Sequence, residues 1–404
     1  MDAAGNTGRL LYKIYRALTY GLTPLVHLHL RWRRRRGLEH PTRWPERLGR
    51  PSLPRPSGPL LWFHAVSLGE GMAAIPVIKR FVQCRPDLNI LMTTTTLSAF
   101  EVIKNQLPSS VLYQISLALL NARVSMKSFR LWSQPVLLPL ISLMLSKFSL
   151  IIPLSSMQAI RFQILQAPPF IINFSGDLKY AIECDASNGE TGSIEDLKGQ
   201  LASRRVWMAS SIHRGEEKVM LGVHKALIQV YPDLVTIIVP RNPQHGLEIA
   251  QELQKGGQNV ALRSQHQRIM PGTQIYMVNT LGELRCLYRL SPVAVIGGSF
   301  FPGLAGHNIS EAAAAGCAVL TGHHVGHFSH MVKEMQRLNP LSIIQVSGTL
   351  ELEEAIMELL NDTKVLDARR MAAKQAFCAL SHGIIANVWN LLNFHVLRVS
   401  LQES

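Results

Sequence analysis

The chain has 404 residues, of which 47% are hydrophobic and 17% charged, and its formal net charge is +14 at pH 7. This composition excludes a disordered or fibrous protein, and the length predicts two or three domains with sizeable cores. The positive charge is unevenly spread, because residues 1–50 hold eleven basic side chains against three acidic ones and so carry +8 by themselves.

The first predicted element is an apolar helix that leads into an arginine cluster. An uncharged run over residues 17–30, interrupted by Pro24, is followed by Arg31 and by four arginines at 33–36. The run is shorter than the roughly 20 residues that a membrane span requires. We therefore predict a helix over residues 10–30 that lies in the membrane interface, with the arginines on anionic head groups. A cleaved organelle-targeting peptide is the second interpretation. Nucleic-acid binding ranks third, because no basic motif with interleaved aromatic residues follows the arginines.

The next element is an apolar run at Leu60–Ala65 that ends in small residues, Ser67 and Gly69, and delivers a carboxylate at Glu70. This pattern predicts a buried strand that turns into a helix beginning near Glu70. Ligands bind at such strand ends in open α/β sheets. A carboxylate in the first helical turn is also favoured by the helix dipole alone, so the position leaves both a catalytic and a purely structural role open.

Strand and helix patterns then alternate along the chain, with one polar break. Further strands are predicted at residues 89–94, 116–121 and 170–173, and then at 206–209, 234–239, 274–278 and 293–296. The Gly-rich segment 185–199 is the predicted linker. This alternation predicts two doubly wound α/β domains with parallel sheets, facing each other across a cleft. A second uncharged run, at 131–146, contains two prolines and is predicted to be a core helix in preference to an interfacial one.

Neither the cysteines nor the histidines form a recognisable metal or disulfide pattern. The five cysteines are widely separated, without CxxC spacing, and we expect them to be reduced. Several histidines lie close together, but no HExxH or Cys/His zinc pattern accompanies them, so no metal site is predicted. These histidines are His307, His323, His324, His327 and His330.

Three predicted strand ends in the second half carry residues of the kind that bind ligands. The strand at 293–296 runs into Gly297 and Gly298, and Asn308 or Ser310 could cap a helix at 311–315 whose free amides suit a phosphate. Arg241 follows the strand at 234–239, where a guanidinium can pair with phosphate, and residues 280–283 follow a third strand. Each is an ordinary loop by itself, but together they indicate a nucleotide site.

These elements belong to a longer series of motifs that resembles the 3-deoxy-D-manno-octulosonic acid (Kdo) transferase family, and most of all its plant mitochondrial members. The resemblance runs in family order from about residue 10 to about residue 330. The matching segments are residues 43–49 (RWPERLG), 64–70 (HAVSLGE), 93–96 (TTTT), 121–125 (NARVS), 176–179 (GDLK), 210–217 (SSIHRGEE), 240–241 (PR), 282–283 (GE), 297–299 (GGS) and 306–308 (GHN).

The resemblance implies a GT-B fold and an inverting, metal-independent transfer of Kdo from CMP-Kdo to a lipid A precursor, in the biosynthesis of a lipopolysaccharide-type glycolipid. The implied organisation is a membrane-interface or targeting segment at 1–50, an acceptor domain at 51–187, a donor domain at 188–380 and a C-terminal helix at 381–404. Glu70 matches the family's general base, and Lys179 matches a lysine that stabilises the transition state. The implied CMP-binding residues are Pro240, Arg241, Leu281, Gly282, Glu283, Asn308, Ile309, Ser310 and Glu311.

The chain also departs from the family pattern. Between Thr96 and Asn121 the family has a further strand and helix, with acidic residues before a Trp-Pro pair, and this sequence lacks that unit. An in-frame loss such as alternative splicing would account for the shortened form. Smaller departures are Ala312 in place of a proline and His327 in place of an asparagine, and both are expected to be tolerated.

The sequence therefore predicts an enzyme whose partners are CMP-Kdo, a lipid A precursor and a membrane surface, with no nucleic acid and no cofactor other than its substrates. The alternative is a catalytically impaired isoform that binds CMP or CMP-Kdo without transfer, and a second alternative is a membrane-docked structural protein. The expected location is the mitochondrion, in association with a membrane, and the alternative is the cytoplasmic face of a bacterial inner membrane.

Overall fold

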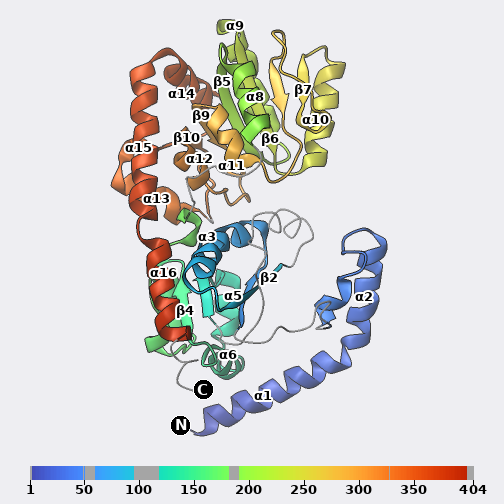
Figure 1. Cartoon of the computed structure of the whole chain (residues 1–404), viewed down its shortest axis with the longest axis vertical. Helices are drawn as coiled ribbons and strands as arrows, with labels where there is room; N and C mark the ends of the chain where they lie inside the picture. Colours follow the sequence, from blue (N-terminus) through green and yellow to red (C-terminus); the bar gives the residue numbers. More distant parts are fainter. Residues whose placement is uncertain are drawn as a thin grey trace. The chain divides into compact units, whose positions relative to one another are not determined.

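The computed structural model describes residues 2–48, 50, 60–94, 118–181, 191–326 and 328–397. The chain divides into two compact units (Figure 1). The first unit combines Met1–Ala181 with Gly383–Ser404, and the second is Ile182–His382.

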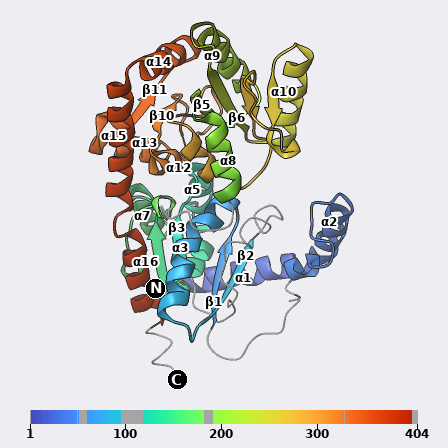
Figure 2. The same cartoon turned by 45° about the horizontal axis from the view of Figure 1, so that its top comes forward.

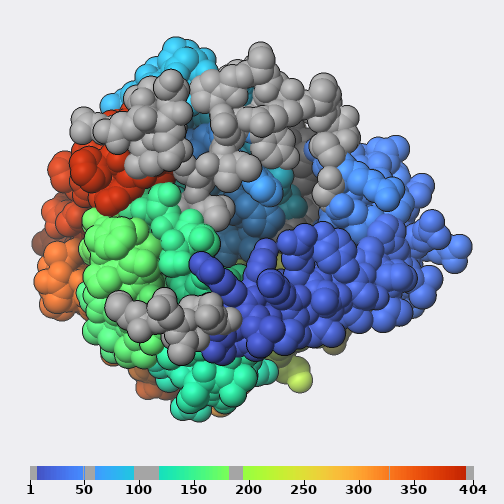
Figure 3. Space-filling view, turned by 90° about the horizontal axis from the view of Figure 1, so that it is seen from below, coloured from blue at the N-terminus to red at the C-terminus, as the bar shows by residue number. Residues whose placement is uncertain are grey.

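The first unit begins with two helices, α1 (Asp2–Gly21) and α2 (Thr23–Arg35). The predicted helix at 10–30 thus starts earlier and is broken near Leu22, because Pro24 has no N–H to donate and occupies the first turn of α2. Helix α1 packs against α6 (Leu138–Leu145), where a Cβ on Gly8 would lie 2.7 Å from the carbonyl oxygen of Pro139. Figure 3 shows the dark blue N-terminal helices on the surface of this unit, with the teal segment that includes α6 close to them.

Both N-terminal helices expose large apolar side chains next to the arginines. Leu18, Tyr20, Leu25 and Leu28 are each more than half exposed. Among the described residues, no helix combines the length and the apolar composition that crossing a membrane requires.

The remainder of the first unit holds two short parallel sheets. β1 (Leu60–Ala65) pairs with β2 (Asn89–Thr94), and β3 (Ala118–Ala122) pairs with β4 (Leu150–Pro153). Figure 2 shows β1 beside β2. Over residues 60–94 and 118–181 no ladder joins one pair to the other, so the single sheet expected for this domain is divided into two. Its other elements are η1 (Trp44–Leu48), α3 (Leu68–Cys84), α5 (Met126–Trp132), α7 (Ser156–Ile164), η3 (Pro169–Ile171), η4 (Leu178–Tyr180), α16 (Ile384–Leu392) and η8 (Asn393–Leu397).

The strand predicted at 170–173 is wrong. Pro168 and Pro169 lead instead into the short 3₁₀ helix η3, and only Ile172 makes an isolated bridge, to Ile151. Proline pre-sets the backbone angle that this helix needs and removes a donor that a ladder would use. The strand expected at 116–121 is present as β3, whereas β4 is a further strand that the sequence pattern does not predict, because it is only four residues long.

The uncharged run at 131–146 forms parts of two helices rather than one. Helix α5 ends at Trp132 and α6 begins at Leu138, on either side of Pro135. Leu145 is buried in a cluster with Ile151 and Phe162, and Met144 is exposed. The run therefore covers the core beneath β3 and β4, as the preferred interpretation expected.

The C-terminal helix α16 returns to the first unit. The ring of Trp389 lies edge-on to Phe81 of α3, with their centroids 4.7 Å apart. The side chain of Ile384 packs against Gly176, where a Cβ would lie 3.1 Å from Cγ1 of Ile384.

The second unit is built on a seven-stranded parallel sheet in the order β11-β10-β9-β5-β6-β8-β7. The four strands predicted in this half are confirmed as β5 (Arg205–Ile212), β6 (Leu234–Pro240), β8 (Ile275–Met277) and β9 (Val293–Ile296). Three further strands of three or four residues escape the sequence pattern, namely β7 (Val260–Leu262), β10 (Ala318–Thr321) and β11 (Ile343–Gln345). The strands that follow β5 in the chain, β6 to β8, lie on one side of β5, whereas β9 to β11 lie on the opposite side of β5. The strand order therefore reverses between β5 and β9.

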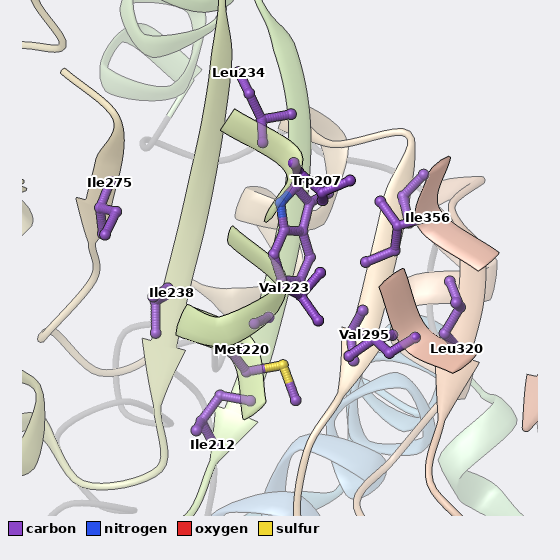
Figure 4. Packing of buried hydrophobic residues seen from close by; sticks show 14 of the residues in the cluster. Trp207, Ile212, Met220, Val223, Leu234, Ile238, Ile275, Val295, Leu320 and Ile356 are labelled. Carbon is purple, nitrogen blue, oxygen red and sulfur yellow. The ribbon is translucent and has the colours of Figure 1, made fainter. Parts of the chain in front are cut away.

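Helices cover this sheet and share one core with it. Figure 4 shows Trp207 of β5 among Val223, Val295, Leu320 and Ile356, and all five are fully buried. The linker predicted at 185–199 is wrong in its second part, because Thr191–Leu201 forms helix α8, and residues 185–190 lie outside the described ranges. The other helices are α9 (Glu216–Val230), α10 (Pro243–Lys255), η5 (Arg263–Gln265), α11 (Leu284–Leu287), η6 (Tyr288–Leu290), α12 (Ser310–Ala315), α13 (Ser329–Leu338), η7 (Pro340–Ser342), α14 (Thr349–Asn361) and α15 (Thr363–Ser381).

Candidate functional site

Glu70 stands at the carboxyl end of β1, in the first turn of α3. Ser67 caps this helix: its side chain accepts a hydrogen bond from the Glu70 N–H, and the Glu70 carboxylate accepts from the N–H groups of Val66 (2.8 Å) and Ser67 (3.2 Å). This capping box satisfies N–H groups that would otherwise lack helical partners. Oε2 accepts both of these bonds, and the side chain is exposed, so Glu70 combines a structural role with access to solvent.

Lys179 lies in η4 of the same unit, and Glu70 is one of the charges that act on it. Burial lowers the pKa of Lys179 below its usual value, the positive charge of Arg123 lowers it further, and the carboxylates of Asp177 and Glu70 oppose this shift. The Glu70 carboxylate and the Lys179 side chain therefore lie within electrostatic reach of each other in this unit.

The backbone around Lys179 is held by a polar contact between β3 and η4. The Asn121 side chain donates to Asp177 Oδ1 (2.9 Å) and accepts from the N–H of Leu178 (3.0 Å), while Asp177 accepts from the N–H of Lys179 (2.9 Å). Asn121 has a left-handed backbone, with φ of 56°, which asparagine tolerates better than most residues. In the sequence Asn121 is only one member of a motif, and its role in positioning Lys179 becomes visible only in three dimensions.

The second unit presents its candidate residues at the carboxyl edge of its sheet. Pro240 ends β6 and is buried, whereas Arg241 follows it with an exposed side chain and a backbone N–H bonded to the carbonyl oxygen of Ile212 (2.9 Å). Because all seven strands are parallel, Arg241 lies at the same edge as the residues that follow β5, β8 and β9.

The turn at residues 281–283 places two exposed residues before a paired carboxylate. Leu281 is 50% exposed, and Gly282 has a φ of 91°, which favours glycine. Burial alone would raise the pKa of Glu283, but hydrogen bonds from Arg263 and Thr280 outweigh this effect and lower it. The ion pair with Arg263 (2.6 Å) therefore keeps Glu283 charged and limits its movement.

The loop before α12 is organised by Asn308, whose side-chain oxygen accepts from both the N–H (3.1 Å) and the hydroxyl (2.7 Å) of Ser310. Ile309 and Ser310 are buried, and the Glu311 carboxylate pairs with Arg285 (3.2 Å). Asn308 thus organises the start of the helix, but the prediction that Asn308 or Ser310 is its cap is wrong, because Ile309 occupies the capping position. Ala312, one of the two small departures from the family pattern, is buried in this helix, and His327 lies outside the described residues.

One functional candidate does not stand out in the sequence: Glu216, which is fully buried at the start of α9. Its Oε2 accepts from the N–H groups of His213 (2.9 Å) and Gly298 (2.7 Å), and its Oε1 accepts from those of Ser299 (2.9 Å) and Phe300 (3.0 Å). The carboxylate thereby ties the loop after β5 to the loop after β9, where the strand order reverses. A Glu at a helix start is common, so its partners could not be inferred from its position alone.

Metal ligation receives no support from the part of the chain that the structure describes. Within it, no group of three or more His, Cys, Asp or Glu side chains is arranged to hold an ion. Four of the five cysteines fall within this part, and none of these four forms a disulfide.

Comparison with known proteins gives consistent results over nearly the whole chain. A family model described as "3-Deoxy-D-manno-octulosonic-acid transferase (kdotransferase)" matches residues 42–116 and 112–182. The "Probable 3-deoxy-D-manno-octulosonic acid transferase, mitochondrial" of Arabidopsis thaliana is 58% identical over 434 residues, covering 97% of each protein. The "3-deoxy-D-manno-octulosonic acid transferase" of Haemophilus influenzae is 28% identical over 356 residues, covering 78% of this chain and 81% of that protein.

Solved structures support the fold. The crystal structure of a glycosyltransferase from Rickettsia africae covers 84% of this chain and 99% of its own, with 10% identity and a TM-score of 0.51. Similarity at this level of identity concerns the fold alone. The predicted α/β fold of the GT-B type is confirmed.

Proposed function

The chain belongs to the Kdo transferase family, and we propose that it moves Kdo from CMP-Kdo onto a lipid A precursor. The observation that carries this proposal is the 58% identity to the Arabidopsis protein over 97% of both chains. The proposed reaction joins an acceptor hydroxyl to the anomeric carbon of Kdo with inversion, while CMP departs with the bonding electrons.

In this reaction Glu70 is the proposed general base. A sugar hydroxyl is a poor nucleophile until a base within hydrogen-bond reach removes its proton. Glu70 is exposed and sits at a strand end, and its hydrogen bonds to Val66 and Ser67 engage the same carboxylate oxygen, Oε2. The other oxygen is the one we assign to the acceptor hydroxyl.

Lys179 supplies the proposed positive charge beside this base. Its ammonium group would offset the negative charge that builds up as the bond to the CMP phosphate breaks. The leaving group is already a phosphate, so in this proposal Lys179 and Arg241 provide the charge stabilisation that a metal ion provides in other transferases.

The donor site is proposed at the carboxyl edge of the second sheet. Arg241 is exposed there, Asn308 organises the loop before α12, and Glu283 is held by Arg263. We assign CMP to these residues and to their neighbours Pro240, Leu281, Gly282, Ile309, Ser310 and Glu311.

The N-terminal helices are the proposed membrane contact. Apolar side chains of α1 and α2 are exposed, and several arginines lie at the end of α2, which suits an interface with anionic head groups. Because the Arabidopsis relative is named mitochondrial, we propose a mitochondrial, membrane-associated location.

A second candidate function, CMP binding without transfer, is favoured by signs of an internal gap. The alignment with the Arabidopsis protein extends over 434 residues, 30 more than this chain contains, so at least 30 aligned positions have no residue here. The family model matches in two pieces that meet at residues 112–116.

Two measurements on the full chain separate these functions: CMP binding by calorimetry, and Kdo transfer to a lipid A precursor. Transfer with CMP binding supports the first function, and binding without transfer supports the second. A matched chain, in which the corresponding segment of the Arabidopsis protein is inserted between Thr96 and Asn121, should then gain activity. Equal activity of the two chains would contradict our interpretation of the gap.

The base assignment is tested by Glu70→Gln. Glutamine at this position can still complete a capping box, so the helix start is retained while the proton acceptor is lost. We expect transfer to become undetectable while CMP affinity changes less than about twofold, because Glu70 lies outside the unit that carries the donor residues. Unchanged turnover would refute the assignment.

A further inference from the structure

Two histidines outside the proposed catalytic and donor residues meet at the point where the strand order of the second sheet reverses. His213 follows β5, and His307 lies in the loop that leads to α12. Their Nε2 atoms are 2.7 Å apart, and their rings face each other end to end, with a centroid distance of 5.0 Å and an interplanar angle of 22°. At this distance one imidazole donates to the other, so the pair shares a proton between two nitrogens.

The surrounding backbone is shaped to accept this pair. Gly298 has a φ of 68°, and a Cβ there would lie 2.6 Å from Cδ2 of His307 and 3.4 Å from Cδ2 of His213. Its N–H is bonded to Glu216, which also holds the N–H of His213. The same buried carboxylate thus fixes the backbone beneath both rings.

The charges around the pair are mostly engaged with other groups. Burial lowers the pKa of His307 to about 4, and the nearby His213 and Arg241 act in the same direction. Glu216 is occupied by four backbone N–H groups, Arg214 pairs with Glu248, and Glu217 lies 3.7 Å from His245. A proton on His307 is therefore unfavourable until an anion arrives, and Arg241 is the nearby cation that would draw one in.

We propose that His213 and His307 act together as a proton-linked phosphate subsite, which takes up one proton when the phosphate of CMP binds beside Arg241. This inference rests on the proposed donor site and adds two residues to it. An anion a few ångströms from a partly buried imidazole favours its charged form strongly enough to reverse the preference of the empty site. The resulting imidazolium donates a charge-assisted hydrogen bond, which is stronger than a neutral one.

The test is CMP binding by calorimetry in buffers of different ionisation enthalpy, which reports the protons taken up per CMP bound. The full chain is compared with His307→Gln and His213→Gln, which change two different elements, and with His382→Gln as a control at the end of α15, outside the proposed subsite. CMP titrates its own phosphate, but that contribution is the same in every variant. Thermal denaturation checks that each variant is folded.

We expect the unmodified chain and His382→Gln to take up about one more proton per CMP than either subsite variant does. Near pH 6 each subsite variant should bind CMP about tenfold more weakly, and near pH 8 the difference should shrink, because fewer pairs are then protonated. Cytidine, which lacks the phosphate, should cause no difference in proton uptake among the four chains.

The outcomes that would overturn the inference are distinct from those that concern the donor site. Normal CMP binding with the same proton uptake in all four chains would refute the imidazole pair and leave the donor site intact. Proton uptake with cytidine would refute the assignment to phosphate. Failure of the unmodified chain to bind CMP would refute the donor site and the subsite together.

Discussion

Replacing Glu216 by glutamine should disrupt the centre of the second unit while hardly altering its shape. The carboxylate is fully buried, and each of its oxygens accepts two backbone N–H bonds, from the loops after β5 and β9. Glutamine offers only one oxygen, so its NH₂ group must face two N–H groups that need an acceptor. Two buried donors are then left without a partner.

The magnitude follows from those two donors. Each buried N–H that loses its acceptor costs about 1–3 kcal/mol, so Glu216→Gln should lower the free energy of unfolding by about 4 kcal/mol. For a unit of about 200 residues this corresponds to a fall in Tm of about 10 °C. Because the affected loops carry His213 and Gly298, CMP affinity should fall as well.

The assay is chemical and thermal denaturation of the full chain, followed by tryptophan fluorescence, with CMP binding measured in parallel. Glu248→Gln is the matched control, since its carboxylate pairs with Arg214 on the surface and should contribute less than about 1 kcal/mol. A Glu216→Gln protein that unfolds within about 0.5 kcal/mol of the unmodified chain would refute the argument, because surface substitutions already reach that range.

Three further predictions concern other buried or charged groups. Burial lowers the pKa of His224 from 6.5 to about 4, so between these pH values the unfolded chain binds a proton there that the folded chain does not. The free energy of unfolding should therefore fall by about 3 kcal/mol as the pH decreases from 6.5 to 4. Denaturant titrations across this range should show a flatter dependence for His224→Gln, and an identical dependence would contradict the assignment. Gly322→Ala should lower the free energy of unfolding by about 2 kcal/mol or more, because its Cβ would collide with the backbone carbonyl of Ser299, and an unchanged denaturation midpoint would exclude that collision. Lys179→Gln should reduce the rate of Kdo transfer by about 100-fold in a single-turnover assay, and a rate within a few-fold of the original would rule out its proposed role.

Much of the fold is accessible from the sequence because its strongest patterns are local. The strands at Leu60–Ala65, Asn89–Thr94 and Leu234–Pro240 are largely apolar runs bounded by turn residues, which is typical of buried parallel strands. The capping residue Ser67 and the carboxylate of Glu70 can likewise be recognised three residues apart.

Short or proline-bounded segments are harder to assign. The strands at Ala318–Thr321 and Ile343–Gln345 are too short to show a period, and they form because a neighbouring strand supplies their partners. Phe170 and Ile171 form an apolar run in sequence, but the prolines before them start a 3₁₀ helix. In each case the deciding interaction lies outside the segment itself.

The sequence by itself determined the alternation of strands and helices, the family resemblance, and the identity of Glu70, Lys179 and Arg241 as candidates. Only the tertiary structure decided which distant groups meet. Glu216 binds the N–H of Gly298, which lies 82 positions later in the sequence, and His213 contacts His307, which lies 94 positions later. Such pairs arise because parallel strands bring all their carboxyl ends to one edge of the sheet, and strand order, which residue spacing does not encode, decides which ends are neighbours.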